Sequence, residues 1–283
     1  MFRDPSIFRD GLFEGQVAFV TGGGTGIGLH IAGELRLLGA HVVLGSRSEE
    51  KLAQGHAALE ALEGPGRVAH RVCNVRDSAS IDDAVSWTLQ EFGRIDLLVN
   101  NAGGQFPTPA VAMPEKGWDA VIATNLTGTF RMTQTVVNRA MAAQQSGAVV
   151  NIIAQMWNGF PMMSHTGAAR AGVDNLTKSL GFELAQLGIR VNAVAPGVIL
   201  SSGVDNYAEA FQKAFLDSVH YIPAGRLGTM REVAAAVVFL LSPAAGFITG
   251  TTLRVDGGEP LFGSSAAGQA REHFVAVKPP TYE

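Results

Sequence analysis

Short apolar runs rich in β-branched residues alternate along this chain with longer stretches whose apolar residues repeat at helical spacing. Near-continuous apolar segments such as Leu97-Leu98-Val99 are typical of strands that are covered on both faces. The alternation predicts a parallel sheet with crossover helices. Seven runs are predicted to be strands, at residues 16–20, 41–44, 67–73, 95–99, 148–153, 190–194 and 252–255. We therefore expect one doubly wound α/β domain, with helices on both faces of a seven-stranded parallel sheet.

The limits of this domain follow from where the pattern begins and ends. Residues 1–14 are predicted to be an N-terminal extension, residues 15–258 the domain, and residues 259–283 an irregular C-terminal tail. Inside the domain, the segment 203–228 carries Tyr207, Phe211 and Phe215 at helical spacing, which predicts a variable lid over a ligand site. An amphipathic helix docked on the core would show the same spacing, so this alternative stays open.

Composition narrows the function classes. The 283 residues, 47% of them hydrophobic, suffice for one sizeable core. A net charge of -4 and the lack of any basic run argue against nucleic acid as a partner. The longest strongly apolar run, residues 233–241, is about half the length of a membrane span and is predicted to be a buried helix. Neither a secretory signal nor a peroxisomal address is visible, so a cytoplasmic location is the default expectation.

The single cysteine, Cys73, lies among the β-branched residues of a predicted strand. A buried small apolar side chain is the interpretation that this position favours over a ligand or a nucleophile. One cysteine can form neither a disulfide framework nor a cysteine-based zinc site, and we predict no metal site in this chain.

The first chemical motif directly follows the first predicted strand and leads into an apolar helical pattern. It reads Thr21-Gly-Gly-Gly-Thr-Gly-Ile-Gly28. Glycines permit a tight turn and let backbone amides approach a pyrophosphate at the start of a helix. A purely structural glycine turn is the alternative, but the strand-turn-helix context favours a dinucleotide. The residues predicted to contact this cofactor are Gly22, Thr25, Gly26, Ile27 and Gly28.

The end of the second predicted strand indicates which dinucleotide is bound. An acidic residue there would bind the ribose hydroxyls of NAD, but this chain has Gly45-Ser46-Arg47. Ser46 and Arg47 can bind a 2′-phosphate, which a carboxylate would repel. NADP(H) is therefore favoured over NAD(H), with a solvated surface charge as the alternative role of Arg47.

Several further motifs, taken together with the glycine turn, resemble the short-chain dehydrogenase/reductase superfamily over about residues 15–258. They are Asn100-Asn101-Ala102-Gly103, Asn125 within Thr124–Gly128, Pro196-Gly197, and Ile248-Thr249-Gly250 followed by Asp256-Gly257-Gly258. The resemblance implies a Rossmann-type fold and a homotetramer. In such a tetramer the C-terminal tail would wrap onto a neighbouring subunit. It also implies that Asn74 and Val75 flank the adenine, that Asn101, Ala102 and Gly103 line the cofactor ribose, and that Pro196, Gly197, Val198 and Ile199 cover the nicotinamide.

Within that superfamily the chain looks most like the peroxisomal-type trans-2-enoyl-CoA reductases and, more loosely, the 2,4-dienoyl-CoA reductases. The stretches that carry this likeness are 101–106, 125–130, 167–173, 175–180 and 195–199. The superfamily places a Tyr four residues before a Lys on one helix, but here Thr166 and Arg170 take those two positions. The superfamily Ser would fall near Ala154 or Gln155, and neither has a hydroxyl.

The missing Tyr changes the chemistry that this chain is predicted to perform. Reducing a ketone requires an acid for the alkoxide, which ordinary members supply as a Tyr beside a Lys. Reducing an enoyl thioester instead places charge on the thioester oxygen, which hydrogen-bond donors can stabilise. Thr166 is predicted to donate to that oxygen, and Arg170 to act as a fixed cation on the nicotinamide ribose, with a helix-surface charge as its alternative.

Other side chains near this helix are candidates for the source of the proton that Cα must receive. By resemblance, Asn125 holds an ordered water that could deliver it, unless Asn125 is a core or capping residue. His165 titrates near neutrality, but a structural or substrate-loop role is favoured for it. Asp174 stands where enoyl-CoA reductases of this type have been assigned a Tyr, and with Lys178 it is interpreted as an ordinary ion pair. Residues 155–163 would suit an acyl chain or plain core packing equally well.

These observations predict an NADPH-dependent reductase of trans-2-enoyl-CoA thioesters, whose partner is a small-molecule acyl thioester. A 2,4-dienoyl-CoA reductase is a second possibility, disfavoured because no Tyr stands near Gln155 or Met156. Another oxidoreductase of the superfamily is a third. A catalytically silent dinucleotide-binding protein is a fourth, since both the Ser and the Tyr are replaced.

Overall fold

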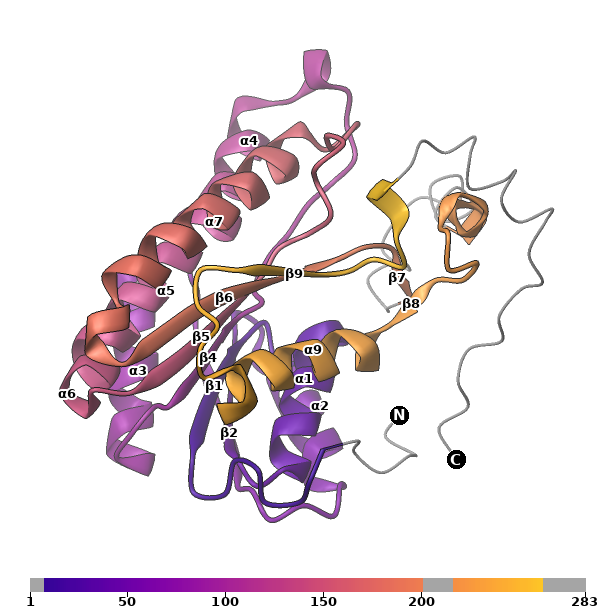
Figure 1. Ribbon diagram of the computed structural model, residues 1–283. Helices are drawn as coiled ribbons and strands as arrows, with labels where there is room; N and C mark the ends of the chain where they lie inside the picture. The colour runs from indigo at the N-terminus through magenta and orange to yellow at the C-terminus, as the bar shows by residue number, and fades with distance from the viewer. Residues whose placement is uncertain (1–7, 201–215, 262–283) are drawn as a thin grey trace.

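The computed structural model describes residues 8–200 and 216–261, and its centre is a parallel sheet of seven strands (Figure 1). The strand order is β3-β2-β1-β4-β5-β6-β9, and every neighbouring pair is parallel. The strands are β1 (Val17–Thr21), β2 (His41–Ser46), β3 (Val68–Val72), β4 (Leu97–Asn100), β5 (Gly147–Ile152), β6 (Ile189–Pro196) and β9 (Thr252–Val255). All seven predicted strands and the doubly wound architecture are confirmed. The order reverses between β1 and β4, the point at which sheets of this kind bind ligands.

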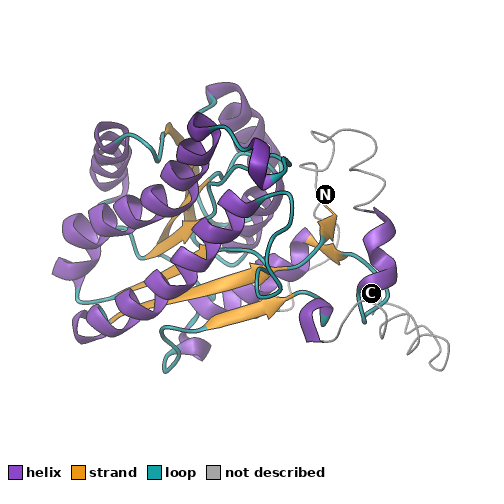
Figure 2. Ribbon diagram, turned by 90° about the horizontal axis from the view of Figure 1, so that it is seen from above, coloured by secondary structure: helices purple, strands orange, loops and turns teal. Residues whose placement is uncertain are grey.

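Helices cover both faces of the sheet (Figure 2). On one face lie α1 (Gly26–Leu37), α2 (Glu49–Glu60) and α9 (Met230–Leu241), and on the other α3 (Ser78–Phe92), α4 (Glu115–Ile122), α5 (Gly128–Val136), α6 (Ala142–Gln144) and α7 (Ser164–Glu183). Two π-helical turns, Ala123–Thr127 and Val137–Met141, join α4, α5 and α6 into one continuous helical rod. A short pair, β7 (Ile199–Leu200) and β8 (Gly228–Thr229), lies beyond the main sheet. The shorter 3₁₀ turns span Ala110–Ala112, Ala185–Leu187, Ser218–Tyr221, Pro243–Ala245 and Glu259–Leu261.

The two-residue repeat of the strands divides most of the core into two large clusters, one on each face of the sheet, and a small third cluster contains Ile153 and Val173. In β1, Ala18 and Val20 pack into the cluster beneath α1 and α9, whereas Val17 and Phe19 pack into the cluster beneath α3 and α5. Full burial of each large apolar side chain contributes about 1.5–3 kcal/mol. Cys73 belongs to the second cluster, as predicted, and burial raises the pKa of its thiol to about 12.

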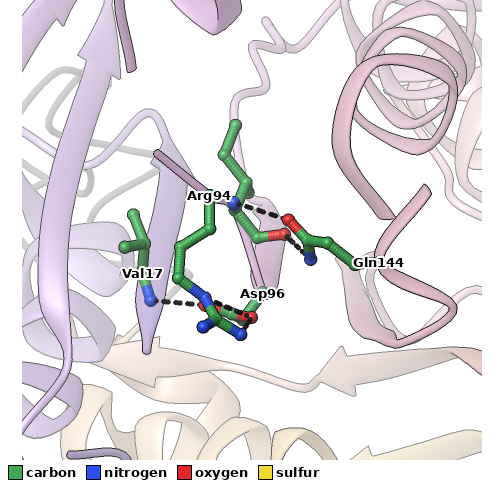
Figure 3. A network of polar contacts seen from close by, with 5 residues as sticks. Val17, Arg94, Asp96 and Gln144 are labelled. Carbon is green, nitrogen blue, oxygen red and sulfur yellow. Dashed lines mark hydrogen bonds and ion pairs between the residues drawn. The ribbon is translucent and has the colours of Figure 1, made fainter. Parts of the chain in front are cut away.

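The amino ends of β1 and β4 are held together by a closed polar network (Figure 3). Asp96 is 8% exposed and accepts a hydrogen bond from the N–H of Val17, at 2.9 Å, and a forked pair from the guanidinium of Arg94. The side chain of Gln144 both donates to and accepts from the backbone of Ile95. Both carboxylate oxygens of Asp96 and both polar atoms of the Gln144 side chain therefore have partners.

Some of the predicted boundaries fall where the structure describes only part of the segment. Residues 203–215 of the predicted lid, with Tyr207, Phe211 and Phe215, lie outside the described residues, as do residues 1–7 and 262–283. Of the predicted N-terminal extension, Phe13 is fully buried in the core beside α1. The apolar run 233–241 is a helix packed on that core, as predicted. No helix in the described part of the chain is long and apolar enough to cross a membrane.

Candidate active site

The glycine turn joins β1 to α1 at the point where the strand order reverses. Thr25 precedes the helix, and its side chain makes no capping hydrogen bond among the described residues. Gly26 has φ of +57°, and a side chain there would meet nothing within 4 Å. In contrast, a Cβ on Gly28 would come within 2.4 Å of the carbonyl oxygen of Gly22. A tight turn, open space and uncapped amides are what a pyrophosphate at a helix start requires, so these residues fit a dinucleotide.

Asn101 braces this turn from the end of β4. Its side-chain amide donates to the carbonyl oxygens of Thr21, at 3.0 Å, and Gly22, at 3.2 Å. The hydroxyl of Thr21 in turn accepts hydrogen bonds from the N–H groups of Asn101 and Ala102, both at 3.0 Å. The side chain of Asn101 is thus spent on the turn itself, and its predicted contact with the cofactor ribose stays a prediction.

Arg47 lies just after β2 as a solvent-exposed side chain. It makes no hydrogen bond or ion pair with any of the described residues, whereas Ser46 accepts a long hydrogen bond from the N–H of Ser48. Asn74 accepts from the N–H of Arg76, and Val75 packs against Gly128 below it. A free guanidinium at the end of the second strand is a suitable partner for a ribose phosphate.

Thr166 and Arg170 lie one turn apart on α7, and the structure brings them together at the carboxyl end of β5. Arg170 is 8% exposed and donates to the carbonyl oxygen of Ile152 at 2.8 Å. No carboxylate pairs with it in the described part of the chain, and burial lowers the pKa of its guanidinium to about 10. Because that value is still well above neutrality, Arg170 remains a cation. The surface-charge alternative for Arg170 is therefore wrong.

The guanidinium of Arg170 lies directly over Gly103. A Cβ at position 103 would be 2.3 Å from Nη2 of Arg170 and 3.3 Å from Oδ1 of Asn125. Glycine at this position therefore makes room for the arginine, and the three predicted site residues Gly103, Asn125 and Arg170 share one corner of the molecule.

Asn125 is fully buried in the π-helical turn between α4 and α5. Its side-chain amide pairs with the backbone of Gly104: Oδ1 accepts from the N–H at 2.9 Å, and Nδ2 donates to the carbonyl oxygen at 3.1 Å. Asn125 therefore fixes the loop after β4, and the water that resemblance assigns to it stays a prediction. Turns of this rare helical type occur frequently at functional sites.

His165 is a residue whose importance the sequence did not make clear. Its ring is fully buried and accepts the N–H of Thr166 on Nδ1 at 2.8 Å, while the Thr166 hydroxyl lies 3.4 Å from the same nitrogen. Phe106 contacts the ring edge to face. Thr166 is also fully buried, so its predicted contact with substrate requires the site to open and stays a prediction.

Asp174 and Lys178 form the ion pair predicted for them, with 2.6 Å between carboxylate and ammonium. The other oxygen of Asp174 accepts from the hydroxyl of Thr252 on β9, also at 2.6 Å. Burial opposes ionisation of this carboxyl, but the hydrogen bonds from Lys178 and Thr252 outweigh it and lower its pKa. The pair therefore ties α7 to the edge of the sheet.

The predicted nicotinamide cover begins where β6 ends. Gly197 lies against the backbone of Asp256, so that a side chain would collide with it at 2.8 Å. Val198 and Ile199 line a cavity of about 200 Å³, together with Arg226 and Arg254. The loop 155–163 was predicted either to pack in the core or to contact an acyl chain, and it holds both buried and exposed side chains. Met163 is buried, whereas Trp157 is 41% exposed beneath the guanidinium of Arg254.

Comparison with known proteins identifies the family of this chain. The sequence profile of the family described as Enoyl-(Acyl carrier protein) reductase matches residues 22–259. A probable 2,4-dienoyl-CoA reductase of Bacillus subtilis is 36% identical over 250 residues, which are 88% of this chain and 98% of that protein. The 3-oxoacyl-[acyl-carrier-protein] reductase FabG of Thermotoga maritima is 40% identical over 246 residues, 87% of this chain and 98% of that one. The solved structure of the citronellol catabolism dehydrogenase AtuB of Pseudomonas aeruginosa PAO1 has a TM-score of 0.80 and 44% identity, covering 90% of this chain and 99% of that chain.

Proposed function

We propose that this chain, which belongs to the short-chain dehydrogenase/reductase superfamily of oxidoreductases, reduces the carbon-carbon double bond of trans-2-enoyl-CoA thioesters with NADPH. The observation that carries the proposal is the pair Thr166 and Arg170, which lie buried where the superfamily has its Tyr and Lys. Neither side chain can protonate an alkoxide at neutral pH, since a threonine hydroxyl is not an acid in this range and the arginine keeps its proton.

A buried cation suits the reduction of an enoyl thioester. Bound NADPH supplies a hydride, and its addition to Cβ of an enoyl thioester leaves negative charge on the thioester oxygen. Arg170 is held in a fixed position by the carbonyl oxygen of Ile152 and by Gly103, and no carboxylate among the described residues neutralises it. Arg170 is predicted to lie on the nicotinamide ribose, and from there a preoriented cation stabilises such an enolate through its charge without giving up a proton, while the Thr166 hydroxyl is the donor predicted for the thioester oxygen itself.

Arg47 supports NADPH as the cofactor. Its guanidinium is exposed and lies at the end of β2, where a carboxylate would select NAD. We expect Arg47→Ala to weaken NADPH binding about tenfold, the loss of one charge-assisted contact, and to leave NADH binding unchanged. Fluorescence titration measures both affinities. Lys116→Ala, at an exposed cation on α4, is the matched control and should bind NADPH as the parent does.

A second candidate is reduction of 2,4-dienoyl-CoA thioesters, which the likeness to the Bacillus subtilis protein favours. The same cation would stabilise the longer dienolate. Reduction of 3-oxoacyl thioesters, the reaction named for the Thermotoga maritima relative, is disfavoured here because the acid at position 166 is replaced.

The test is NADPH oxidation with crotonyl-, octenoyl- and decenoyl-CoA beside acetoacetyl-CoA and a 2,4-dienoyl-CoA. We expect turnover of the enoyl substrates at least about tenfold faster than of the ketone, a difference of about 1.4 kcal/mol in barrier. Faster reduction of acetoacetyl-CoA would contradict the proposal. NADPH binding without any turnover would indicate a silent binding protein.

A further inference from the structure

The imidazole of His165 carries a buried N–H group with no partner among the described residues. Its Nδ1 accepts the N–H of Thr166 at 2.8 Å, an N–H that the Met163 carbonyl oxygen also accepts, so the proton of the ring is assigned to Nε2. Nε2 makes no hydrogen bond to any residue in 8–200 or 216–261, although the side chain is 0% exposed. Leaving a buried donor unpaired lowers the stability of a folded protein. A native structure that keeps such a group therefore calls for a functional explanation.

The ring is held on two sides and cannot easily turn to find another acceptor. On one side the N–H of Thr166 points at Nδ1. On the other, the ring of Phe106 lies edge to face with it, with 4.6 Å between centroids and 86° between planes. Flipping the imidazole would put the Cδ2–H group in the place of Nδ1, and the hydrogen bond from the N–H of Thr166 to the ring would be lost. The unpaired donor is therefore a fixed feature of the site.

The elements around His165 place this donor beside the proposed reaction site. The residue lies in the first turn of α7, directly before Thr166 and five positions before Arg170. Phe106 comes from the loop after β4, two residues beyond Gly104, which Asn125 holds through both atoms of its amide. The donor thus lies between the loop and the helix that also carry Gly103 and Arg170.

We propose that Nε2–H of His165 donates a hydrogen bond to the carbonyl oxygen of the bound acyl thioester, after Phe106 turns away from the imidazole. This inference rests on the proposed function and deepens it. An Nε2–H group can only donate, so its partner is an acceptor, and a thioester oxygen that gains negative charge is the acceptor this reaction provides. The Thr166 hydroxyl, which is the donor predicted for the same oxygen, lies 3.4 Å from Nδ1 of the ring. The Thr166 backbone keeps the imidazole in its donating tautomer.

Two amide substitutions separate the two nitrogens of the ring. In His165→Asn, the side-chain oxygen can replace Nδ1 as acceptor for Thr166, but no donor reaches the position of Nε2. In His165→Gln, the longer side chain carries an N–H to that position. With octenoyl-CoA and saturating NADPH, we expect the Asn variant to lose about 100-fold in kcat, and the Gln variant to keep most of it.

The opposite ranking would overturn the proposal, because a residue that only caps the helix needs the Nδ1 acceptor, which Asn keeps. Wild-type kcat in both variants would overturn it as well. Thermal unfolding and NADPH titration accompany the kinetics, and both are expected to match the parent protein. If the Asn variant fails to fold, nitrogen NMR of the histidine-labelled parent replaces it: a shift of the Nε2–H signal on adding octanoyl-CoA is expected, and an unmoved signal contradicts the proposal.

Failure of the proposed function can be told apart from failure of this inference. Octanoyl-CoA has no double bond to reduce, so its affinity for the NADP⁺-loaded protein reports binding alone. If the parent reduces no enoyl thioester but binds octanoyl-CoA about tenfold more tightly than the Asn variant does, the hydrogen bond from His165 is supported and the proposed reaction is contradicted. Equal affinities of parent and Asn variant would contradict the hydrogen bond from His165. A parent protein that does not bind octanoyl-CoA would contradict both proposals.

Discussion

Two arginines at opposite edges of the sheet show how differently the two edges are built. Arg94, at the amino edge, is half-exposed and forks onto Asp96, and the hydrogen bonds and charge of that carboxylate raise its pKa. Arg170, at the carboxyl edge, is buried against a carbonyl oxygen with no carboxylate among the described residues, and burial lowers its pKa to about 10. One charge is neutralised by a carboxylate, and the other has no carboxylate partner among the described residues.

The neutral polar groups follow the same division. Gln144 at the amino edge satisfies both backbone groups of Ile95, whereas His165 at the carboxyl edge keeps a buried N–H without a partner in the described structure. Satisfied polar groups stabilise a fold, and unsatisfied ones lower its stability unless a ligand completes them. The comparison teaches that the polar groups of the network at the amino edge complete one another, whereas the carboxyl edge keeps buried polar groups that our proposed function assigns to ligands.

Removing the buried cation should have the largest effect. Arg170→Met fills much of the same volume without charge, so we expect kcat/KM for octenoyl-CoA to fall at least about 100-fold. The thermal midpoint should stay unchanged or rise, because an unneutralised buried charge is lost. Steady-state kinetics and thermal unfolding measure the two effects. Arg170→Lys keeps a cation and serves as the control, with a smaller loss of activity. A Met variant that is active but unstable would reverse the proposed roles of the two edges.

Breaking the amino-edge network should reverse this pattern. Asp96→Ala removes the acceptor for Val17 and the partner of Arg94, so we expect a loss of about 2–3 kcal/mol in the free energy of unfolding. Since Arg94 is half-exposed, the loss should not reach the upper values seen for fully buried pairs. Urea denaturation measures it, and kcat/KM of the folded variant should remain that of the parent. Asp82→Ala, at a surface ion pair with Arg139, is the control and should cost less than about 1 kcal/mol.

The smallest effect is expected at Asp174, which lies on the same helix as Arg170 but is neutralised. Asp174→Asn should cost about 1 kcal/mol near neutral pH, because the charged partner Lys178 is exposed while the bond to Thr252 is not lost entirely. The folded-state pKa of Asp174 is lowered, so its contribution is complete above the ordinary aspartate pKa and disappears as pH falls through the lowered value. The difference between the urea midpoints of parent and variant should therefore be largest at neutral pH and disappear at strongly acidic pH. A gap that widens in acid would contradict the direction of the shift.

The sequence predicted the sheet well because strand periodicity and the glycine turn are local signals. Each of the seven strands could be read from a few adjacent β-branched residues. Partners that meet only through the strand order could not be predicted. Asp96 and Val17 are 79 positions apart, and Asp174 and Thr252 are 78 apart. Their contacts depend on which strands become neighbours, which periodicity does not encode.

At the candidate site the residue types were informative, but their partners were not. Thr166 and Arg170 stood out because they replace expected residues, and the structure places both in the buried corner beside Gly103. Nothing in the sequence indicated that Asn125 would pair with Gly104, since the π-helical turn that aims it there has no compositional mark. The sequence could not predict the unpaired Nε2 of His165 either, because whether a buried atom lacks a partner depends on which described residues surround it.

The rate at which the buried thiol of Cys73 is alkylated reports how often this part of the sheet opens. Cys73 follows β3, and its N–H donates to the carbonyl oxygen of Ser46 at 2.9 Å, next to the predicted adenosine end of the cofactor. Alkylating reagents attack the thiolate, which a pKa of about 12 and 2% exposure make almost absent from the native protein. Because the sequence holds no other cysteine, each modified molecule marks one excursion of this strand into solvent. A ligand bound across the ends of β2 and β3 would slow the alkylation of Cys73 without contacting its sulfur atom.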